Sequence, residues 1–314
     1  MILVTGASGH LGTRLVDELE RRHEEVRVLL RGESHMPKGV EVVRGDIRDE
    51  EAVKKAARGA ETIFHLAAVV DYHPAPRKEI YGVNVLGTMN LLKHSEAERF
   101  VYQSSTAVYG RRHANPANEL TRYRPYSFYG ETKVMAERLV IKEDGIVVRS
   151  PVIYGPGFNE GFYFMMAQIQ RGKMPIIGDG TNQMQWIYVD DLVNGLILAR
   201  EKGKGGQAYL LAGSEVKTQE EMAAMTARFL GVPPPATHVS ARSAYALAYY
   251  KMLSARLSGK RPKVEAEHIR KITANRTFDT SKARRELGFE PKTTYEKGMR
   301  EMVEEFKHSR AARP

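Results

Sequence analysis

A tyrosine and a lysine stand four positions apart in the stretch SFYGETK, residues 127–133. Four residues make about one helical turn, so on a helix Tyr129 and Lys133 share a face and the ammonium can act on the phenol. An unassisted phenol has a pKa of about 10, too high for a base at neutral pH, and a nearby cation lowers that pKa. The pair therefore has the chemistry of a general acid or base, although the same spacing also occurs on solvated helix faces.

A glycine-rich turn near the start of the chain indicates what such a phenol would act beside. The sequence TGASGHLG places three glycines directly after the apolar run 1–4 and opens an apolar helical pattern. Backbone N–H groups in this context, together with the N-terminus of the helix, bind the pyrophosphate of a dinucleotide. A purely structural tight turn is the alternative. The residues predicted to bind the nucleotide here are Gly6, Ser8, Gly9, His10, Leu11 and Gly12.

The second predicted strand ends in VRVLLRG and carries Arg31 where many dinucleotide-binding folds carry a carboxylate. A carboxylate at this place binds the ribose 2′-hydroxyl of NAD, whereas an arginine accommodates the 2′-phosphate of NADP. The sequence therefore favours NADP(H), and NAD(H) is the alternative if Arg31 is only solvated. Asp46 and Ile47, in RGDIRD, are expected to flank the adenine, with a turn or cap as the other interpretation of Asp46.

The elements that position these residues alternate between apolar strands and amphipathic helices, which predicts an α/β fold with a Rossmann-type doubly wound parallel sheet. A smaller, mostly helical C-terminal domain is expected to bind the substrate. The dinucleotide-binding domain is assigned to 1–154 and 186–213, and the substrate-binding domain to 155–185 and 214–314. Strands are expected at 26–30, 40–43, 62–66, 100–103, 146–149, 186–189 and 208–211, and helices at 50–58, 79–96, 191–200 and from Thr218 to Leu230.

Composition narrows the class of protein. The 314 residues contain no cysteine, which excludes disulfides and thiolate chemistry and fits a reducing compartment. The net charge of +10 is dispersed along the chain, which fits a phosphorylated cofactor and predicts no nucleic-acid partner. Neither a spanning apolar run nor a signal peptide is visible, so a cytoplasmic protein is expected. No cluster has metal-ligand spacing, so no metal is predicted, and Asp190-Asp191 is interpreted as a helix start.

Several motifs follow one another along the chain: TGASGHLG, GDI, HLAA at 65–68, NVLGT at 84–88, SSTAVYG at 104–110, YGETK and VIYGPG. Together they resemble the extended short-chain dehydrogenases/reductases, the NAD-dependent epimerase/dehydratase superfamily, over essentially the whole chain. The resemblance implies that Ser105 hydrogen-bonds the substrate oxygen, that Tyr129 gives or takes the hydroxyl proton while hydride moves at nicotinamide C4, and that Lys133 holds the nicotinamide ribose. His65 is interpreted as a structural residue. A homodimer through helices near 79–96 and 129–142 is also implied. The further residues expected beside the cofactor are Leu66, Ala67, Ala68, Asn84, Pro151 and Val152.

Two positions separate the branches of this family. Sugar-nucleotide members usually carry an Asn and an Arg where this chain has Val152 and Met184, and dehydratases carry an Asp-Glu pair where it has Thr106-Ala107. Loss of these polar groups disfavours a sugar-nucleotide pyrophosphate and the elimination of water. The chain is most similar to the 3β-hydroxysteroid dehydrogenase and dihydroflavonol reductase-like branch. That similarity implies an NADP(H)-dependent oxidoreductase that interconverts a ketone and a secondary alcohol on a fairly apolar, steroid-, isoprenoid- or flavonoid-like small molecule.

Alternative functions are a nucleotide-sugar 4-epimerase with tightly bound NAD and a non-catalytic dinucleotide-sensing regulator. Two aromatic segments also have more than one interpretation. The rings and the methionine after the YGP turn either wall an apolar pocket or form the core of the smaller domain. The segment 241–257, ARSAYALAYYKMLSARL, is either a lid, an ordinary packed helix or a helix resting on a membrane surface. The first segment comprises Phe158, Phe162, Tyr163, Phe164 and Met165.

Overall fold

The computed structural model describes residues 1–34, 36–70, 75–110, 115–158, 161–258, 269 and 272–309. Its contacts divide the chain into two compact units. Unit 1 comprises Met1–Ile153, Ile187–Ala212 and Phe278–Lys292. Unit 2 comprises Tyr154–Trp186, Gly213–Thr277 and Thr293–Pro314.

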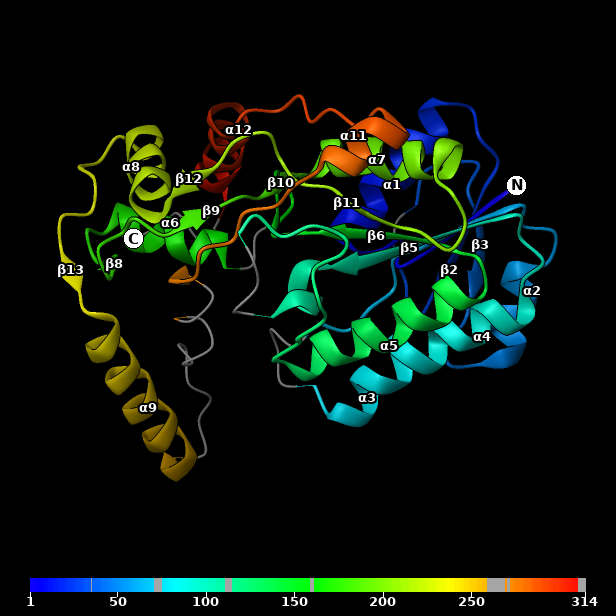
Figure 1. Ribbon diagram of the computed structural model, residues 1–314, viewed down its shortest axis with the longest axis horizontal. Helices are drawn as coiled ribbons and strands as arrows, with labels where there is room; N and C mark the ends of the chain where they lie inside the picture. Colours follow the sequence, from blue (N-terminus) through cyan, green and yellow to red (C-terminus); the bar gives the residue numbers. More distant parts are fainter. Residues whose placement is uncertain are drawn as a thin grey trace. The chain divides into compact units, whose positions relative to one another are not determined.

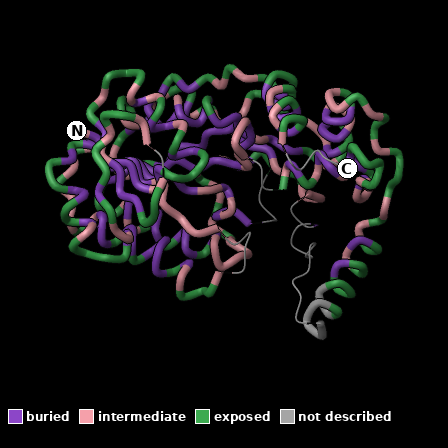
Figure 2. Tube along the Cα trace, turned by 180° about the vertical axis from the view of Figure 1, so that it is seen from behind, coloured by how far each residue is buried: buried purple, intermediate pink, exposed green. Residues whose placement is uncertain are grey.

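A seven-stranded parallel sheet forms the centre of unit 1, in the order β11-β6-β5-β4-β1-β2-β3 (Figure 1). Its strands are mostly apolar because both faces of the sheet are covered, and Figure 2 shows them as the buried centre of the unit. The order reverses between β1 and β4, so the carboxyl ends of these strands form the crevice where such sheets bind ligands. The predicted Rossmann-type sheet is confirmed. The strands are β1 (Ile2–Thr5), β2 (Val26–Leu30), β3 (Glu41–Arg44), β4 (Thr62–His65), β5 (Arg99–Ser105), β6 (Ile146–Ser150) and β11 (Ala208–Leu210).

Helices cover both faces of this sheet (Figure 1). One face carries α1 (His10–Arg21), α7 (Val189–Lys202) and α11 (Ser281–Leu287), and the other carries α2 (Glu50–Ala57), α4 (Gly87–His94) and α5 (Phe128–Lys142). The helix predicted for 79–96 is built from three consecutive pieces and ends at His94. These pieces are α3 (Arg77–Tyr81), the π-helical turn η1 (Gly82–Leu86) and α4.

Two expected boundaries differ from the structure. The strand predicted for 186–189 is only β10 (Ile187–Tyr188), because Val189 already begins α7 and both aspartates that follow lie in its first turn, where the helix dipole favours anions. The segment 278–292, which the expected division places with the C-terminal domain, belongs to unit 1. Phe278 forms a backbone bridge with Ala117, and Asp279 donates its N–H to the Ala117 carbonyl at 2.8 Å.

Unit 2 is mainly helical, with short paired strands. The predicted start of α8 is confirmed: Thr218 and Glu221 form a capping box, and the helix ends at a left-handed Gly231. Among the described residues, no helix combines the length and the apolar character needed to cross a bilayer. The helices of this unit are α6 (Phe162–Gln170), α8 (Gln219–Leu230), α9 (Ala241–Ser258) and α12 (Tyr295–His308). Its short strands are β8 (Ile176–Ile177), β9 (Gln183–Met184), β12 (Lys217–Thr218) and β13 (His238–Val239), and β7 (Ile153–Tyr154) spans the change of unit.

Candidate active site

The glycine turn between β1 and α1 is built so tightly that two of its positions require glycine. Gly6 has a φ of +74°, and a Cβ on it would lie 2.6 Å from the Ala67 nitrogen. A Cβ on Gly12 would lie 2.1 Å from the Gly6 carbonyl oxygen. Gly9 is the N-cap residue of α1 and is exposed, as are its neighbours Ser8 and His10. The N-terminus of α1 therefore faces solvent. These residues fit a bound pyrophosphate, since the described first turn of α1 adds no carboxylate to repel it.

The end of β4 lies directly against this turn. Leu66 donates its N–H to the Thr5 carbonyl at 3.1 Å, and the next residue, Ala67, donates its N–H to the Thr5 hydroxyl at 3.4 Å. Ala68 follows in the loop after β4. His65 is fully buried, and its two ring nitrogens hydrogen-bond the Thr5 and Thr88 hydroxyls, each at 2.8 Å. Burial, followed by the charge of Lys133, lowers the pKa of His65 to about 3, so the ring is neutral at physiological pH. His65 is thus a satisfied structural residue, as its position after an apolar strand predicts.

Asn84 lies in the π-helical turn η1, a type of turn that is frequent at functional sites. Its amide accepts from the Val69 N–H at 2.8 Å and donates to the Val69 carbonyl and to the Thr132 hydroxyl, each at 3.0 Å. The side chain therefore ties the loop after β4 to α5, one residue from Lys133. Its amide is occupied by protein partners, which makes Asn84 a support of the predicted cofactor crevice.

Ser105, Tyr129 and Lys133 come together at the carboxyl ends of β5 and β6. Ser105 ends β5 and caps the 3₁₀ turn η2 (Thr106–Tyr109), where its Oγ accepts from the Ala107 N–H at 3.2 Å. Tyr129 lies in the first turn of α5, and the Lys133 ammonium is 5.9 Å from the centre of its ring. Gly130 permits the close approach of the two segments, because a Cβ there would lie 2.9 Å from the Ala107 carbonyl oxygen. Sequence reasoning missed Gly130, although its N–H bond to the helix cap Ser127 is a recognisable helix-start pattern.

Lys133 is almost completely buried, with 2% of its surface exposed. Its ammonium donates to the Gln103 carbonyl at 2.7 Å and lies 4.5 Å from the centre of the Tyr102 ring. Burial lowers the pKa of Lys133 to about 7, and the Glu137 carboxylate opposes that shift. The lysine is therefore poised between its charged and neutral forms at physiological pH, a property that is common among groups that act in catalysis.

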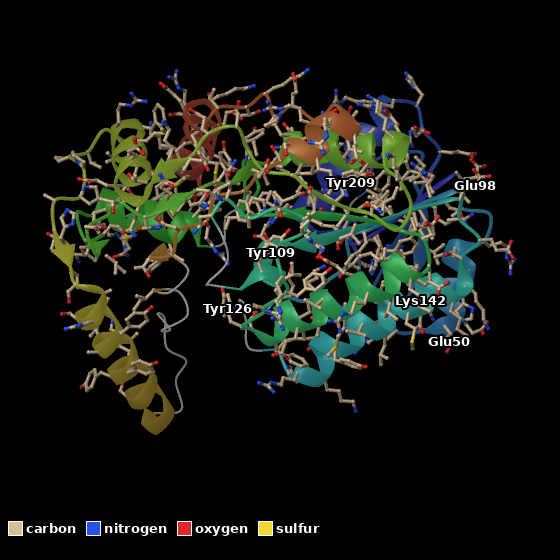
Figure 3. All side chains as sticks on the ribbon, in the orientation of Figure 1. Glu50, Glu98, Tyr109, Tyr126, Lys142 and Tyr209 are labelled. Atoms are coloured by element: carbon tan, nitrogen blue, oxygen red, sulfur yellow. The ribbon has the colours of Figure 1, made fainter. Side chains whose placement is uncertain are left out.

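Behind this lysine, α5 and β6 carry a buried ion pair that sequence reasoning missed. Arg149 donates to both oxygens of Glu137, with a shortest distance of 2.7 Å. Tyr123 donates to the same carboxylate at 2.6 Å, and Arg149 also donates to the Tyr109 hydroxyl at 3.0 Å. Tyr109, marked in Figure 3, belongs to the turn that follows Ser105. The available signal was the spacing of Glu137, one helical turn beyond Lys133.

The ends of β2 and β3 form a basic surface beside the glycine turn. Arg31 is exposed and lies 3.8 Å from a Glu79 oxygen. Arg44, which follows Val43 on the neighbouring strand and pairs in register with Leu30, donates to the Gly32 carbonyl. These two arginines are therefore close neighbours at the edge where an adenine ribose is expected.

Asp46 and Ile47 continue this edge after β3. Arg48 donates two hydrogen bonds to the Asp46 carboxylate, at 2.8 and 2.7 Å, and these bonds lower the pKa of Asp46 below its usual value. Ile47 is buried against Gly87, and its carbonyl accepts from the Asn90 amide at 3.2 Å. The Asp46 carboxylate is thus part of a local turn, which was one of its two interpretations, while the adenine contact of Ile47 stays a prediction.

Pro151 and Val152 follow β6, the strand that pairs Ser150 in register with Ser105. Pro151 is thereby placed beside the end of β5, and the Val152 carbonyl accepts from the Ile187 N–H at 3.0 Å. In unit 2, Met184 is buried in β9. No group of three or more His, Cys, Asp or Glu side chains within the described ranges has a geometry that could hold a metal ion.

Comparison with known proteins places these features in context. The sequence profile described as "NAD dependent epimerase/dehydratase family" matches residues 2–212. A Mycolicibacterium neoaurum protein named 3-beta-hydroxysteroid dehydrogenase is 32% identical over 329 residues, covering 96% of this chain and 90% of that protein. An Escherichia coli O157:H7 protein named N-acetyl-alpha-D-glucosaminyl-diphospho-ditrans,octacis-undecaprenol 4-epimerase is 27% identical, covering 98% of this chain and 96% of that protein. The structure of MoeE5 in complex with UDP-glucuronic acid and NAD has a TM-score of 0.77 and 27% identity, covering 98% of this chain and 99% of that chain.

Proposed function

We propose a specific reaction for this chain, which belongs to the NAD dependent epimerase/dehydratase family and is an oxidoreductase of the extended short-chain dehydrogenase/reductase type. The proposed reaction is the NADP(H)-dependent interconversion of a ketone and a secondary alcohol on a fairly apolar small molecule. The nicotinamide supplies or accepts the hydride. The protein orients the carbonyl through Ser105 and moves the hydroxyl proton through Tyr129, while Lys133 acts on Tyr129 as a cation.

One observation carries this proposal: the buried Lys133 ammonium lies one helical turn from Tyr129, and Gly130 brings that turn against the segment that begins at Ser105. In the reducing direction, the carbonyl carbon gains a hydride and the carbonyl oxygen gains the phenol proton of Tyr129. In the oxidising direction, the same oxygen returns its proton to the phenolate. The cation lowers the pKa of the phenol and thereby supports both directions near neutral pH.

The preference for NADP(H) is supported by the charges at the ends of β2 and β3. Arg31 and Arg44 offer two guanidinium groups where the adenine ribose is expected, and guanidinium groups suit a 2′-phosphate. The Asp46 carboxylate is bound by Arg48, which makes it a weak acceptor for the ribose hydroxyls of NAD. Glu79 contacts Arg31 and would compete with a phosphate for the guanidinium. The preference for NADP(H) therefore requires that Arg31 exchange this long, exposed ion pair for the phosphate.

An apolar substrate is supported by the replacement of polar pyrophosphate ligands and by the relatives. Val152 and Met184 stand where sugar-nucleotide enzymes of this family carry an Asn and an Arg, and Met184 is buried among other residues of unit 2. A relative named as a steroid dehydrogenase matches nearly the whole chain. In unit 2 itself, Phe162 packs edge-on against Trp186 at 5.2 Å, whereas Tyr163 is buried on Phe306 at 5.4 Å. The aromatic segment thus contributes to the core of unit 2, and Phe162 and the exposed Phe164 remain candidates for contact with a substrate.

Nucleotide-sugar 4-epimerisation is the second candidate, because a 4-epimerase is also similar along nearly the whole chain. A single panel separates the two. Purified protein with NADPH or NADH is given hydrophobic ketones and alcohols, beside UDP- and dTDP-sugars, while nicotinamide absorbance and sugar products are followed. Consumption of NADPH by apolar ketones supports the proposal. Epimerised sugar without net change in the cofactor would contradict it and favour the second candidate.

Two proposals concern partners. The first is a homodimer through α3–α4 and α5, which pack side by side (Figure 1). Large apolar side chains are exposed on these helices, and a two-fold contact between helix pairs would cover them. Light scattering tests this, since Met89→Glu is expected to yield monomers, and a wild-type protein that is monomeric would contradict it. The exposed apolar residues are Tyr81, Leu86, Met89 and Met135.

The second is contact of α9 with an anionic lipid surface. Its sequence from 241 to 258 contains basic residues and no Asp or Glu. Tyr250 and Leu247 are 69% and 54% exposed, and Arg242 and Lys251 are exposed on the same helix. Tyrosines flanked by cations suit the headgroup region of an acidic membrane. Co-sedimentation with phosphatidylserine vesicles at low salt tests this, and equal sedimentation of wild type and Tyr250→Ser/Leu247→Ser would contradict it.

A further inference from the structure

Three side chains of α5 that bear on proton transfer follow one another at intervals of one helical turn. Tyr129, Lys133 and Glu137 are four residues apart and therefore line one face of the helix. Glu137 has no exposed surface, and Lys133 is almost as deeply buried. An anion is thus placed in the interior of unit 1, one turn from the ammonium that acts on the phenol.

The Glu137 carboxylate accepts hydrogen bonds from three side chains among the described residues. Arg149 donates from Nε and Nη2, at distances from 2.7 to 3.1 Å. The Tyr123 hydroxyl donates to Oε2 at 2.6 Å, and the Ser104 hydroxyl donates to Oε1. These donors place Glu137 at the centre of a buried hydrogen-bond network. Burial opposes the charge of Arg149, and Glu137 nevertheless raises the pKa of Arg149 above its ordinary value.

Stability alone is a weak reason to bury such a pair. Well-packed apolar residues of similar volume are often as stable as a buried ion pair, or more stable, because removing two charges from water is costly. The position of this pair suggests what the charge contributes. Ser104, which it binds, directly precedes the predicted catalytic serine, and Lys133 lies one turn away along α5.

We propose that Glu137 is a positioning residue whose buried negative charge favours the ammonium form of Lys133 beside Tyr129. This inference rests on the proposed function, since it concerns the lysine that acts on the catalytic phenol. Without the carboxylate, desolvation would leave Lys133 largely neutral at neutral pH, and a neutral amine neither lowers the pKa of Tyr129 nor donates its full set of hydrogen bonds.

The other groups that face Lys133 do not replace this charge. On β5, the Gln103 carbonyl accepts one hydrogen bond and the Tyr102 ring offers its face, both of which orient the ammonium. On β4, His65 is neutral with a pKa of about 3. On β6, Arg149 is a cation whose charge Glu137 offsets.

The test measures the protonation of Lys133 directly and needs no substrate. The pKa of the Lys133 side chain is followed by NMR of isotope-labelled lysine, with its signal assigned from its loss in Lys133→Arg. In Glu137→Gln, the pKa of Lys133 is expected to fall by about one pH unit, because the substitution removes a negative charge one helical turn from the ammonium. Glu131→Gln removes an exposed carboxylate from the first turn of the same helix and is the matched control, expected to leave the titration unchanged.

Glu137→Gln also leaves Arg149 buried without its partner, so a second variant guards against misfolding. Glu137→Gln/Arg149→Gln replaces the ion pair with two neutral amides. In this folded double variant, the pKa of Lys133 is expected to stay below its wild-type value. A wild-type titration in the folded double variant would overturn the proposal and leave the pair a purely structural role. A lowered pKa without turnover of any ketone would contradict the proposed function and still support the role of Glu137.

Discussion

The tight packing of the glycine turn makes Gly12→Ala the sharpest test of how this fold presents its cofactor. The new Cβ would lie 2.1 Å from the Gly6 carbonyl oxygen and 2.7 Å from the Ala7 Cα. The first of these is more than roughly 1 Å inside ordinary contact, and the crowded atoms belong to the backbone, so no side-chain rotation relieves the clash. The turn must move or α1 must shift away from it.

The expected cost is about 1–3 kcal/mol in the free energy of unfolding, the usual range for overpacking in a well-packed interior. Displacement of the same turn is expected to weaken binding of NADPH about ten-fold to a hundred-fold, since each factor of ten corresponds to about 1.4 kcal/mol. Urea denaturation measures the first effect, and quenching or enhancement of nicotinamide fluorescence measures the second.

Gly32→Ala is the matched control for the stability measurement. A Cβ on Gly32 meets no atom of the described residues within 4 Å, so its free energy of unfolding is expected to change by less than about 0.5 kcal/mol. If Gly12→Ala unfolds at the same urea concentration as the wild type and binds NADPH equally well, the reasoning about the turn is wrong.

Two further predictions concern the charges near the site. Arg31→Ala is expected to weaken the binding of NADPH about ten-fold to a hundred-fold and to leave the binding of NADH nearly unchanged, because a charge-assisted contact is worth about 1.5–3 kcal/mol. An equal loss of affinity for both nucleotides in fluorescence titrations would refute a contact of Arg31 with the 2′-phosphate. His65 has a native pKa of about 3, below its unfolded value, so the neutral ring stabilises the fold above pH 6.5 and this contribution is lost as the pH falls toward 3. Between pH 7 and pH 4, the free energy of unfolding from urea denaturation should fall by an amount on the order of 3 kcal/mol in the wild type and by less in His65→Gln. An equal fall in both proteins would contradict a buried, neutral His65.

Much of unit 1 follows from local sequence signals. The alternation of apolar strands and helices predicts the parallel sheet because each buried strand needs helices on both faces. The glycine turn is predictable since Gly6 and Gly12 mark close backbone approaches. The pairing of Tyr129 with Lys133 is equally local, because it depends only on the pitch of one helix.

The remaining features depend on contacts between distant segments. The partnership of Glu137 with Arg149 requires the packing of α5 on β6, and the enclosure of that pair by Tyr123 requires a loop whose path no periodicity defines. The return of 278–292 to unit 1 is likewise set by backbone pairing with Ala117 rather than by composition. The π-helical turn around Asn84 looks like ordinary helix in sequence, because apolar spacing does not distinguish the two.

In the proposed reaction, Tyr129 moves the proton while hydride passes between NADPH and the carbonyl carbon of an apolar substrate. The most direct measurement compares wild type with Tyr129→Phe on the best ketone of the panel, following both NADPH binding by fluorescence and NADPH oxidation by absorbance. We expect Tyr129→Phe to bind NADPH within about three-fold of wild type and to lose about a hundred-fold to ten-thousand-fold in kcat, the range that general acid catalysis contributes. A folded Tyr129→Phe protein that oxidises NADPH at the wild-type rate would contradict it.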